Sequence, residues 1–119
     1  MSTSSFNQPI VQISVEELAD RMANDRSTVQ LVDVREPQEL ELAELEGFLN
    51  LPLSQFADWS NQISTKLDPE VETIVLCHHG MRSAQMCQWL MSQGFTQVKN
   101  VLGGIEAYAA IVDPTVPRY

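Results

Sequence analysis

Apolar and polar positions along the chain follow two different periods, which predicts strands alternating with helices. Short runs rich in Val, Ile and Leu are typical of buried strands, and they lie at 10–13, 29–34, 72–76 and 98–102. Between these runs, apolar residues recur three or four positions apart, and the resulting helices are expected over 15–24, 37–45, 54–67, 83–91 and 105–111. Residues 47–52 are expected to form an extended connection. This alternation predicts an α/β fold with a parallel sheet that is covered on both faces.

Local signals place the ends of several of these helices. Ser14 and Glu17 have the spacing of a capping box, and Pro37 suits the first turn of a helix. Ser54 can cap the next helix, and Gly94 ends the helix that follows the strand at 72–76. The boundaries indicated by capping therefore agree with those indicated by the apolar periodicity.

The length and the apolar content suit one folded unit. A chain of 119 residues with 44% hydrophobic residues can bury one core, covering roughly 65% of its unfolded surface. Residues 1–8 are small and polar, and they predict a flexible N-terminus. We therefore expect a single domain over residues 9–119.

Charge and cysteine content exclude several classes of function. The formal net charge of −9 disfavours nucleic acid and anionic membrane surfaces, since both are bound mainly through Lys and Arg. No apolar run is long enough to span a membrane, and the first residues lack the features of a signal peptide. Two cysteines give no disulfide framework. These features predict a cytoplasmic protein with free thiols.

The segment from Cys77 to Ser83 joins the strand at 72–76 to the following helix. Ligands of parallel α/β sheets bind at the carboxyl ends of the strands, where Cys77 is delivered. A helix N-terminus favours negative charge, and a nearby Arg82 acts in the same direction, so this setting favours a thiolate. Gly80 allows a turn whose amides converge on the sulfur. Cys77 is therefore the candidate nucleophile, and the candidate substrate-binding residues of the loop are His78, His79, Gly80, Met81, Arg82 and Ser83.

Several neighbouring residues have simpler interpretations. Cys87 lies on an apolar stripe of its helix and is expected to pack in the core. His78 and His79 are consecutive in a tight turn, so their rings should diverge, and we predict no metal site. They either line the rim of the pocket or are solvated. The acidic run at 36–46 is expected to be a solvated helix face.

Asp33 and Arg35 end the strand at 29–34, beside the expected position of the loop. We expect Asp33 to support the loop through a salt bridge with Arg82. Arg35 has two alternatives: it binds substrate, or it pairs with an acidic neighbour such as Glu36 or Glu39.

Together these motifs resemble the rhodanese sulfurtransferases. The family's single-domain members carry Cys-x-x-Gly-x-Arg-Ser at this turn, which matches Cys77, Gly80, Arg82 and Ser83. Similar elements lie at 31–37 and 101–108. The resemblance implies a three-layer fold with five parallel strands in the order 1-5-4-2-3. One departure is Glu44, which stands where the family usually has a histidine, so that histidine's role is not carried over.

The resemblance also implies an activity. A sulfane sulfur would pass from a donor such as thiosulfate to a thiol or cyanide acceptor through a persulfide on Cys77, without a cofactor. Positive groups around the family's pocket bind the sulfonate of thiosulfate, a role open to Arg35. A persulfide carrier that exchanges sulfur with protein donors or acceptors is an alternative. A phosphatase or arsenate reductase is less favoured, because its Cys-x5-Arg loop is one residue longer than the loop here.

Overall fold

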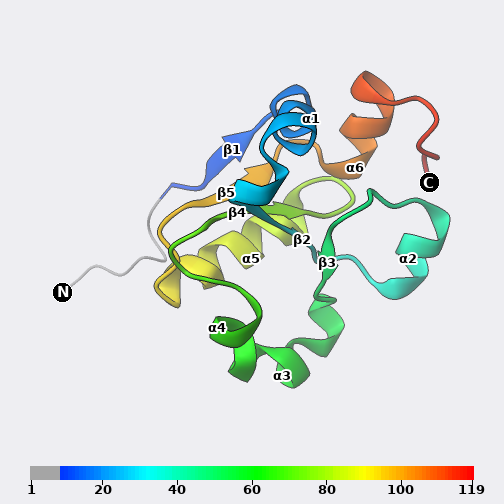
Figure 1. The fold of residues 1–119 in the computed structure, drawn as a ribbon. Helices are drawn as coiled ribbons and strands as arrows, with labels where there is room; N and C mark the ends of the chain where they lie inside the picture. Colours follow the sequence, from blue (N-terminus) through cyan, green and yellow to red (C-terminus); the bar gives the residue numbers. More distant parts are fainter. Residues whose placement is uncertain (1–8) are drawn as a thin grey trace.

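A computed structural model describes residues 9–119; the expected flexible segment 1–8 lies outside the described residues. Five parallel strands form one sheet in the order β1-β5-β4-β2-β3, which confirms the predicted order. The strands, shown in Figure 1, are β1 (Val11–Ile13), β2 (Val29–Asp33), β3 (Leu49–Asn50), β4 (Glu72–Leu76) and β5 (Val98–Val101). The carboxyl ends of the strands thus share one edge of the sheet.

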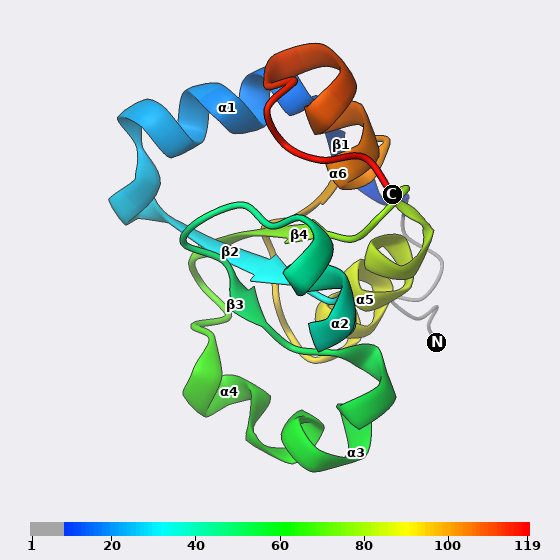
Figure 2. The ribbon, with the colours of Figure 1, turned by 90° about the vertical axis from the view of Figure 1, so that its right-hand side faces the viewer.

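Helices cover both faces, so the predicted three-layer α/β architecture is confirmed. They are α1 (Val15–Asn24), α2 (Pro37–Leu42), α3 (Phe56–Trp59), α4 (Ile63–Lys66), α5 (Met81–Ser92) and α6 (Gly104–Ala107), which continues as a π-helical turn over Tyr108–Val112. Figure 2 shows α1 and α6 on one side of the sheet, with α3 and α4 on the other. Every helix within residues 9–119 is too short or too polar to cross a bilayer.

The core follows from the alternation of side chains along the strands. In β4, Ile74 and Leu76 pack in the cluster under α1 and α6. Val75 and Cys77 point to the opposite face and pack with residues of α3, α4 and α5. Side chains of a strand alternate between the two faces, so a sheet covered on both sides requires the continuous apolar run seen in the sequence.

The helix predicted over residues 37–45 ends earlier, at Leu42. Ala43 is extended, with φ −165° and ψ 138°. Ala43 and Leu45 are buried, whereas Glu44 between them is exposed. This period of two is typical of an extended chain, so the helical interpretation of the last three residues is wrong.

The helix predicted over residues 54–67 is broken into α3 and α4. Short 3-10 turns at Leu53–Gln55 and Ser60–Gln62 precede them. Ser60, Asn61 and Gln62 separate the two helices, and Ser and Asn side chains compete with the backbone for hydrogen bonds. Ser54 does not cap a helix, because its hydroxyl bonds to the Glu36 carboxylate instead.

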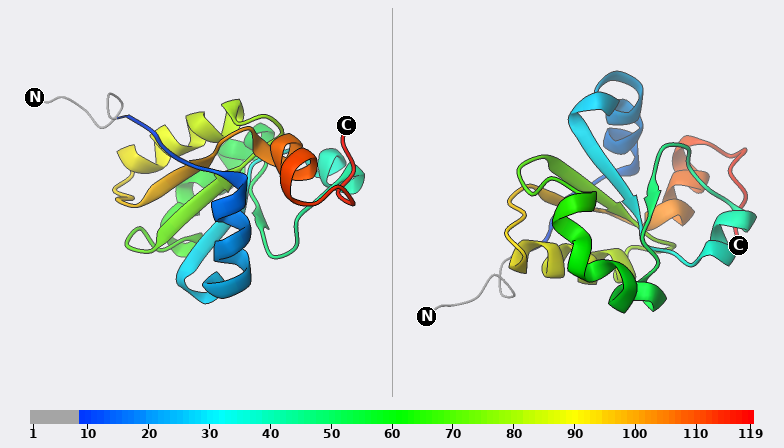
Figure 3. Two further views of the ribbon diagram at one scale, coloured as in Figure 1. Left: turned by 90° about the horizontal axis from the view of Figure 1, so that it is seen from above. Right: turned by 60° about the horizontal axis from the view of Figure 1, so that its bottom comes forward.

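The helix after the Cys77 turn begins earlier than predicted, at Met81 rather than Ser83. Met81 and Arg82 therefore belong to its first turn. At the other end of the chain, the segment after α6 returns toward α2, and both views of Figure 3 show this tail (red) ending beside α2 (cyan). Tyr119 brings the tail into hydrogen-bonding contact with Glu39 of α2.

Candidate active site

The turn between β4 and α5 carries Cys77 at the carboxyl edge of the sheet. β4 ends at Leu76, and Gly80 occupies the N-cap position before Met81. Gly80 has φ 104°, in the left-handed region that side chains disfavour. A Cβ at this position would lie only 3.3 Å from the carbonyl oxygen of Val101 in β5. The turn therefore needs glycine both for its backbone angle and for its contact with β5.

The Cys77 sulfur is buried and has two polar neighbours. Only 1% of the residue is exposed. The Gly80 N–H donates to Sγ across 3.0 Å, and Ser83 Oγ lies 3.2 Å from the same atom. Both groups belong to the N-terminal end of α5, where unpaired amides and the helix dipole stabilise negative charge. The turn thus places an amide suited to an anion, the Gly80 N–H, against a nucleophilic atom.

The start of α6 holds the backbone of the turn in place. The Ile105 N–H donates to the Cys77 carbonyl at 2.9 Å, and the Glu106 N–H donates to the His78 carbonyl at 3.1 Å. A Cβ on Gly104 would lie 2.3 Å from the His78 oxygen. This approach of two backbones leaves no room for a side chain at Gly104.

Asn100 of β5 is a site residue that sequence analysis missed. It is buried, its Oδ1 accepts a hydrogen bond from the Ser83 hydroxyl, and its Nδ2 donates to the Gly80 carbonyl at 3.0 Å. Buried polar side chains are almost always hydrogen-bonded. The available signal in the sequence was a side-chain amide, that of Asn100, within the strand predicted at 98–102, which was expected to be buried.

The predicted salt bridge between Asp33 and Arg82 is wrong, because Asp33 pairs with Arg35. Arg35 Nη2 donates to Asp33 Oδ2 at 2.8 Å, and Nε donates to Oδ1 at 3.0 Å. The residues are two positions apart in an extended segment, so their side chains lie on the same side. Neither the Glu36 nor the Glu39 carboxylate is the partner of Arg35. The full burial of Arg35 favours a structural role over contact with a donor.

Arg82 instead forms a bidentate pair with Glu39 of α2, with N–O distances of 2.7 and 2.9 Å. Hydrogen bonds from Arg82 lower the pKa of Glu39 from 4.5 to about 2. The same bonds raise the pKa of Arg82. For Glu39, the expectation of a purely solvated acidic face is therefore wrong. The pair joins α2 to the first turn of α5.

The two histidines of the turn stack rather than diverge, contrary to expectation. Their ring centroids are 3.9 Å apart, and the Tyr119 ring stacks on the other side of His78 at 3.9 Å and 8°. Burial lowers the pKa of His78, and the charge of His79 acts in the same direction. The Nε2 atom of His78 is buried without a hydrogen-bond partner among residues 9–119. This setting favours neutral His78 in an aromatic layer beside the loop.

The Tyr119 hydroxyl connects the two ion pairs. It accepts a hydrogen bond from Arg35 Nη1 at 2.8 Å and donates one to Glu39 Oε1 at 2.9 Å. Sequence analysis gave Tyr119 no role. No local pattern signals a contact between residues 84 positions apart.

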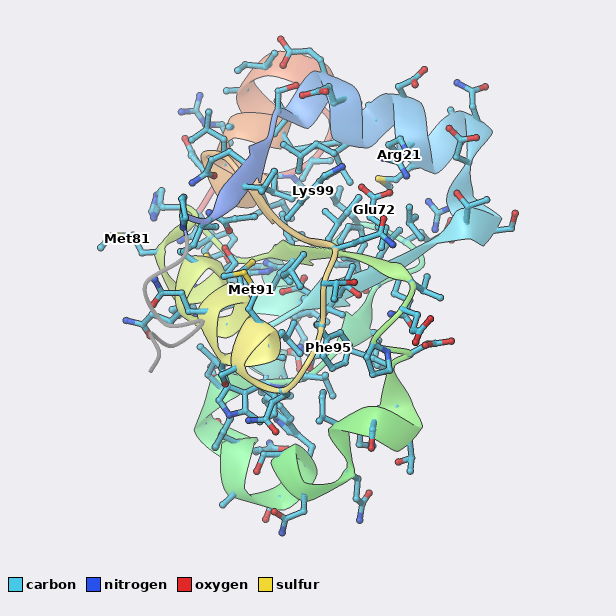
Figure 4. All side chains as sticks on the ribbon, turned by 90° about the vertical axis from the view of Figure 1, so that its left-hand side faces the viewer. Arg21, Glu72, Met81, Met91, Phe95 and Lys99 are labelled. Carbon is cyan, nitrogen blue, oxygen red and sulfur yellow. The ribbon has the colours of Figure 1, made fainter. Side chains whose placement is uncertain are left out.

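The remaining predicted residues differ strongly in exposure. Met81 is 78% exposed and points away from the ribbon in Figure 4. Cys87 is fully buried in the core, as predicted, and burial raises its pKa to about 12. Glu44 is exposed on the extended segment after α2. Within the described part of the chain, no three His, Cys, Asp or Glu side chains are placed to hold a metal ion.

Comparison with known proteins places this geometry in a family. A family model described as a rhodanese-like domain matches residues 14–111. The rhodanese-like/PpiC domain-containing protein 12, chloroplastic, of Arabidopsis thaliana is 49% identical over 117 residues. That match covers 97% of this chain but only 39% of the Arabidopsis protein.

Two further relatives are matched over most of their length. A sulfurtransferase of Allochromatium vinosum is 36% identical over 98 residues, covering 82% of this chain and 87% of that protein. The crystal structure of a rhodanese-related protein from Thermoplasma volcanium superposes with a TM-score of 0.71 at 27% identity, over 92% of this chain and 99% of the other. The chain therefore belongs to the family of rhodanese-like domains.

Proposed function

We propose that the chain transfers a sulfane sulfur from a donor such as thiosulfate to a thiophilic acceptor, through a persulfide on Cys77. The Cys77 thiolate attacks the outer sulfur of thiosulfate, a new S–S bond forms, and sulfite leaves with the electron pair of the broken S–S bond. A thiolate or cyanide then attacks the terminal sulfur, and Cys77 leaves as the thiolate. Neither step needs a metal or an organic cofactor.

The observation that carries this proposal is the hydrogen bond from the Gly80 N–H to Cys77 Sγ at a helix N-terminus. The backbone amides from His78 to Ser83 follow the same turn. In the proposed intermediate they hold the negative charge of the terminal sulfur, as an oxyanion hole holds oxygen. The exposed side chains of this segment, His79 and Met81, then form the rim around the donor.

The environment of Arg82 supports sulfur rather than phosphate as the transferred group. Four residues separate Cys77 from Arg82, one fewer than in Cys-x5-Arg phosphatases. Both terminal nitrogens of the guanidinium are engaged by Glu39. A phosphate would have to displace this carboxylate to be bound bidentately.

A persulfide relay between proteins is the second candidate, and the charges around the loop favour it. Three arginines lie near the carboxyl edge or in the tail, and each pairs with a carboxylate: Arg35 with Asp33, Arg82 with Glu39 and Arg118 with Glu106. Arg26 and Lys66 precede β2 and β4, and so belong to the opposite edge. Among the described residues, a thiosulfate dianion thus meets no unpaired cation near Cys77.

The surface around the turn also suits a large donor better than a small one. Met81 and Leu102 are exposed apolar residues, at 78% and 58%. Met81 begins α5 within the turn, and Leu102 lies between β5 and α6, where its chain neighbours Val101 and Gly103 lie next to Gly80. Two surface hollows of about 340 and 470 Å³ are lined by other parts of the protein, with no residue of the Cys77 turn. A donor carried on a protein would cover these exposed apolar side chains.

Both cysteines are free thiols in the structure. Free thiols persist in reducing compartments, and the proposed cycle needs Cys77 as a thiolate. We therefore propose that the chain acts in such a compartment, with the cytoplasm as our expectation.

The proposed function is tested by incubating the protein separately with thiosulfate, a mercaptopyruvate-type donor and a protein persulfide. Intact-mass spectrometry should show the gain of one sulfur on Cys77, reversed by dithiothreitol. Cys77→Ser should abolish the gain, whereas Cys87→Ser is the matched control and should retain it. Loading by the protein donor alone supports the relay. Loading by none of the three donors contradicts sulfur transfer.

A further inference from the structure

The Ser83 hydroxyl lies between two groups that can each accept its hydrogen. Oγ is 3.2 Å from Cys77 Sγ, and it is hydrogen-bonded to Asn100 Oδ1. All three residues are buried. A serine hydroxyl has a single hydrogen to donate. Ser83 therefore cannot donate to the sulfur and to Asn100 at the same time.

The orientation of the Asn100 side chain is fixed by its other contacts. Nδ2 donates to the Gly80 carbonyl at 3.0 Å and to Gln12 Oε1 at 3.1 Å. A backbone carbonyl can only accept, so the amide nitrogen, not the oxygen, must face Gly80. Oδ1 is consequently left facing the Ser83 hydroxyl.

This arrangement satisfies a neutral thiol better than a thiolate. With the thiol, Cys77 S–H donates to Ser83 Oγ, and Ser83 O–H donates to Asn100 Oδ1. With the thiolate, Ser83 can turn its hydrogen to the sulfur, which leaves the buried Asn100 oxygen without a donor. Otherwise Ser83 keeps its bond to Asn100 and places a lone pair against the charged sulfur. Both outcomes raise the free energy of the thiolate.

A persulfide does not meet this conflict. Its negative charge lies on the terminal sulfur, one bond beyond Sγ. Ser83 can then remain bonded to Asn100 while loop amides stabilise the terminal atom. The network thus disfavours charge on Sγ itself and tolerates charge on the transferred sulfur.

We propose that Asn100 is a positioning residue: it accepts the hydrogen of the Ser83 hydroxyl, keeps that hydrogen from ionised Cys77, and so favours the persulfide over the free thiolate. The inference rests on Cys77 being the nucleophile of the proposed function. It is tested without a sulfur donor, so its failure and that of the proposed function can be told apart.

Other titratable and charged groups surround the same turn. On neighbouring elements they are Asp33, Arg35, Glu39, Glu106 and Tyr119, and on the turn and α5 they are His78, His79, Arg82 and Cys87. The variants described below leave all of these groups unchanged except Cys87, which is replaced throughout. A change between variants therefore reports on Ser83 and Asn100.

The test is the pH dependence of Cys77 alkylation by iodoacetamide, measured in Cys87→Ser protein. The thiolate displaces iodide and forms an S–C bond, so the rate follows ionisation of the sulfur. Asn100→Ala frees the Ser83 hydroxyl to donate to the thiolate. In this variant the midpoint of the pH dependence of alkylation should fall by about one pH unit, which equals about 1.4 kcal/mol. At a pH below the midpoints of both the variant and the Cys87→Ser protein, alkylation of the variant should be about tenfold faster.

A merely structural role predicts the opposite sign. Losing the bond to the Gly80 carbonyl would loosen the amide that faces Sγ and raise the midpoint. An unchanged or raised midpoint in folded Asn100→Ala, checked by circular dichroism, therefore overturns the proposal. So does an equal fall when Asn100→Ala is made in a Ser83→Ala background.

Ser83→Ala alone gives a second test should Asn100→Ala not fold. If Asn100 holds the hydroxyl, Ser83 contributes no donor to the thiolate, and its removal should not raise the midpoint. A rise of about one pH unit would show that Ser83 donates to the ionised sulfur and would refute the proposal.

Discussion

Replacing Glu39 by glutamine tests the ion pair that links α2 to the Cys77 turn. The substitution keeps the size of the side chain but removes the charge opposite Arg82. It also weakens the contact with the Tyr119 hydroxyl, which donates to the same carboxylate at 2.9 Å. The expected result is lower stability at neutral pH, because Arg82 loses its bidentate partner.

The magnitude follows from the pKa of Glu39, which falls from 4.5 to about 2 in the folded protein. A change of this size corresponds to roughly 3 kcal/mol at neutral pH. The Arg82 side chain is 35% exposed, so water screens the pair and we expect about 1–2 kcal/mol. A carboxylate whose pKa is lowered by folding stabilises the protein at pH values above its pKa in the unfolded chain, and this stabilisation is lost as the pH falls through its pKa in the folded protein. The difference between the two proteins should therefore shrink as the pH falls from 4.5 toward 2.

Urea unfolding followed by circular dichroism measures this difference at pH 7 and at two acidic pH values. The matched control is Glu41→Gln, which removes the same charge from an exposed position of α2 and should have little effect. An equal loss in the control would assign the effect to net charge. A loss in Glu39→Gln that stayed constant with pH would refute the ion-pair argument.

The same variant bears on the choice of donor. Glu39→Gln leaves the charge of Arg82 unpaired beside the turn, so thiosulfate should load Cys77 several-fold faster than in the parent. A folded variant with an unchanged thiosulfate rate would show that neutralised arginines do not limit this donor.

Three further substitutions test the other supports of the site. Arg35→Met leaves Asp33 buried without its partner and should cost about 3–5 kcal/mol of unfolding free energy in urea titrations; normal stability with weaker donor binding would restore a substrate role for Arg35. Gly104→Ala forces a Cβ against the His78 carbonyl, so it should lower both the melting temperature and the alkylation rate of Cys77. If neither changed, the close contact between Gly104 and His78 would be contradicted. Tyr119→Phe keeps the ring stack but loses the two hydroxyl bonds, and thermal unfolding should show a loss of about 1 kcal/mol, with no loss expected if the tail is merely adjacent.

The sequence was sufficient to predict the scaffold of the site because local rules govern it. An apolar strand, Gly80 and an amphipathic helix define a strand-to-helix turn at Cys77 with little choice of geometry. The strand order came from family resemblance rather than from periodicity. Helix ends were less predictable, as Ala43 shows: burial of alternate residues overrode a helical pattern in the acidic run.

The pairing of charges could not be predicted in the same way. Asp33 and Glu39 both lie within reach of the turn, and sequence alone assigned Arg82 to the wrong one. The choice depends on where α2 lies relative to α5, which is a property of tertiary packing. Asn100 and Tyr119 were missed for the same reason, because their partners are distant in sequence.

The charge distribution explains how a chain with net charge −9 can support an anionic sulfur. Arg35 and Arg82, the arginines near the turn, each pair with a carboxylate. These ion pairs hold the neighbouring elements in place but add no net positive charge. The remaining attraction comes from dipoles, namely the Gly80 N–H and the first turn of α5, and dipole fields act over short distances. We therefore expect such a site to stabilise charge on an atom that has already entered the turn, and to attract a small anion such as thiosulfate only weakly from solution. A donor delivered by another protein would not need that long-range attraction, so the geometry of the turn and the charge of the whole chain both favour the relay as the hypothesis to test against thiosulfate.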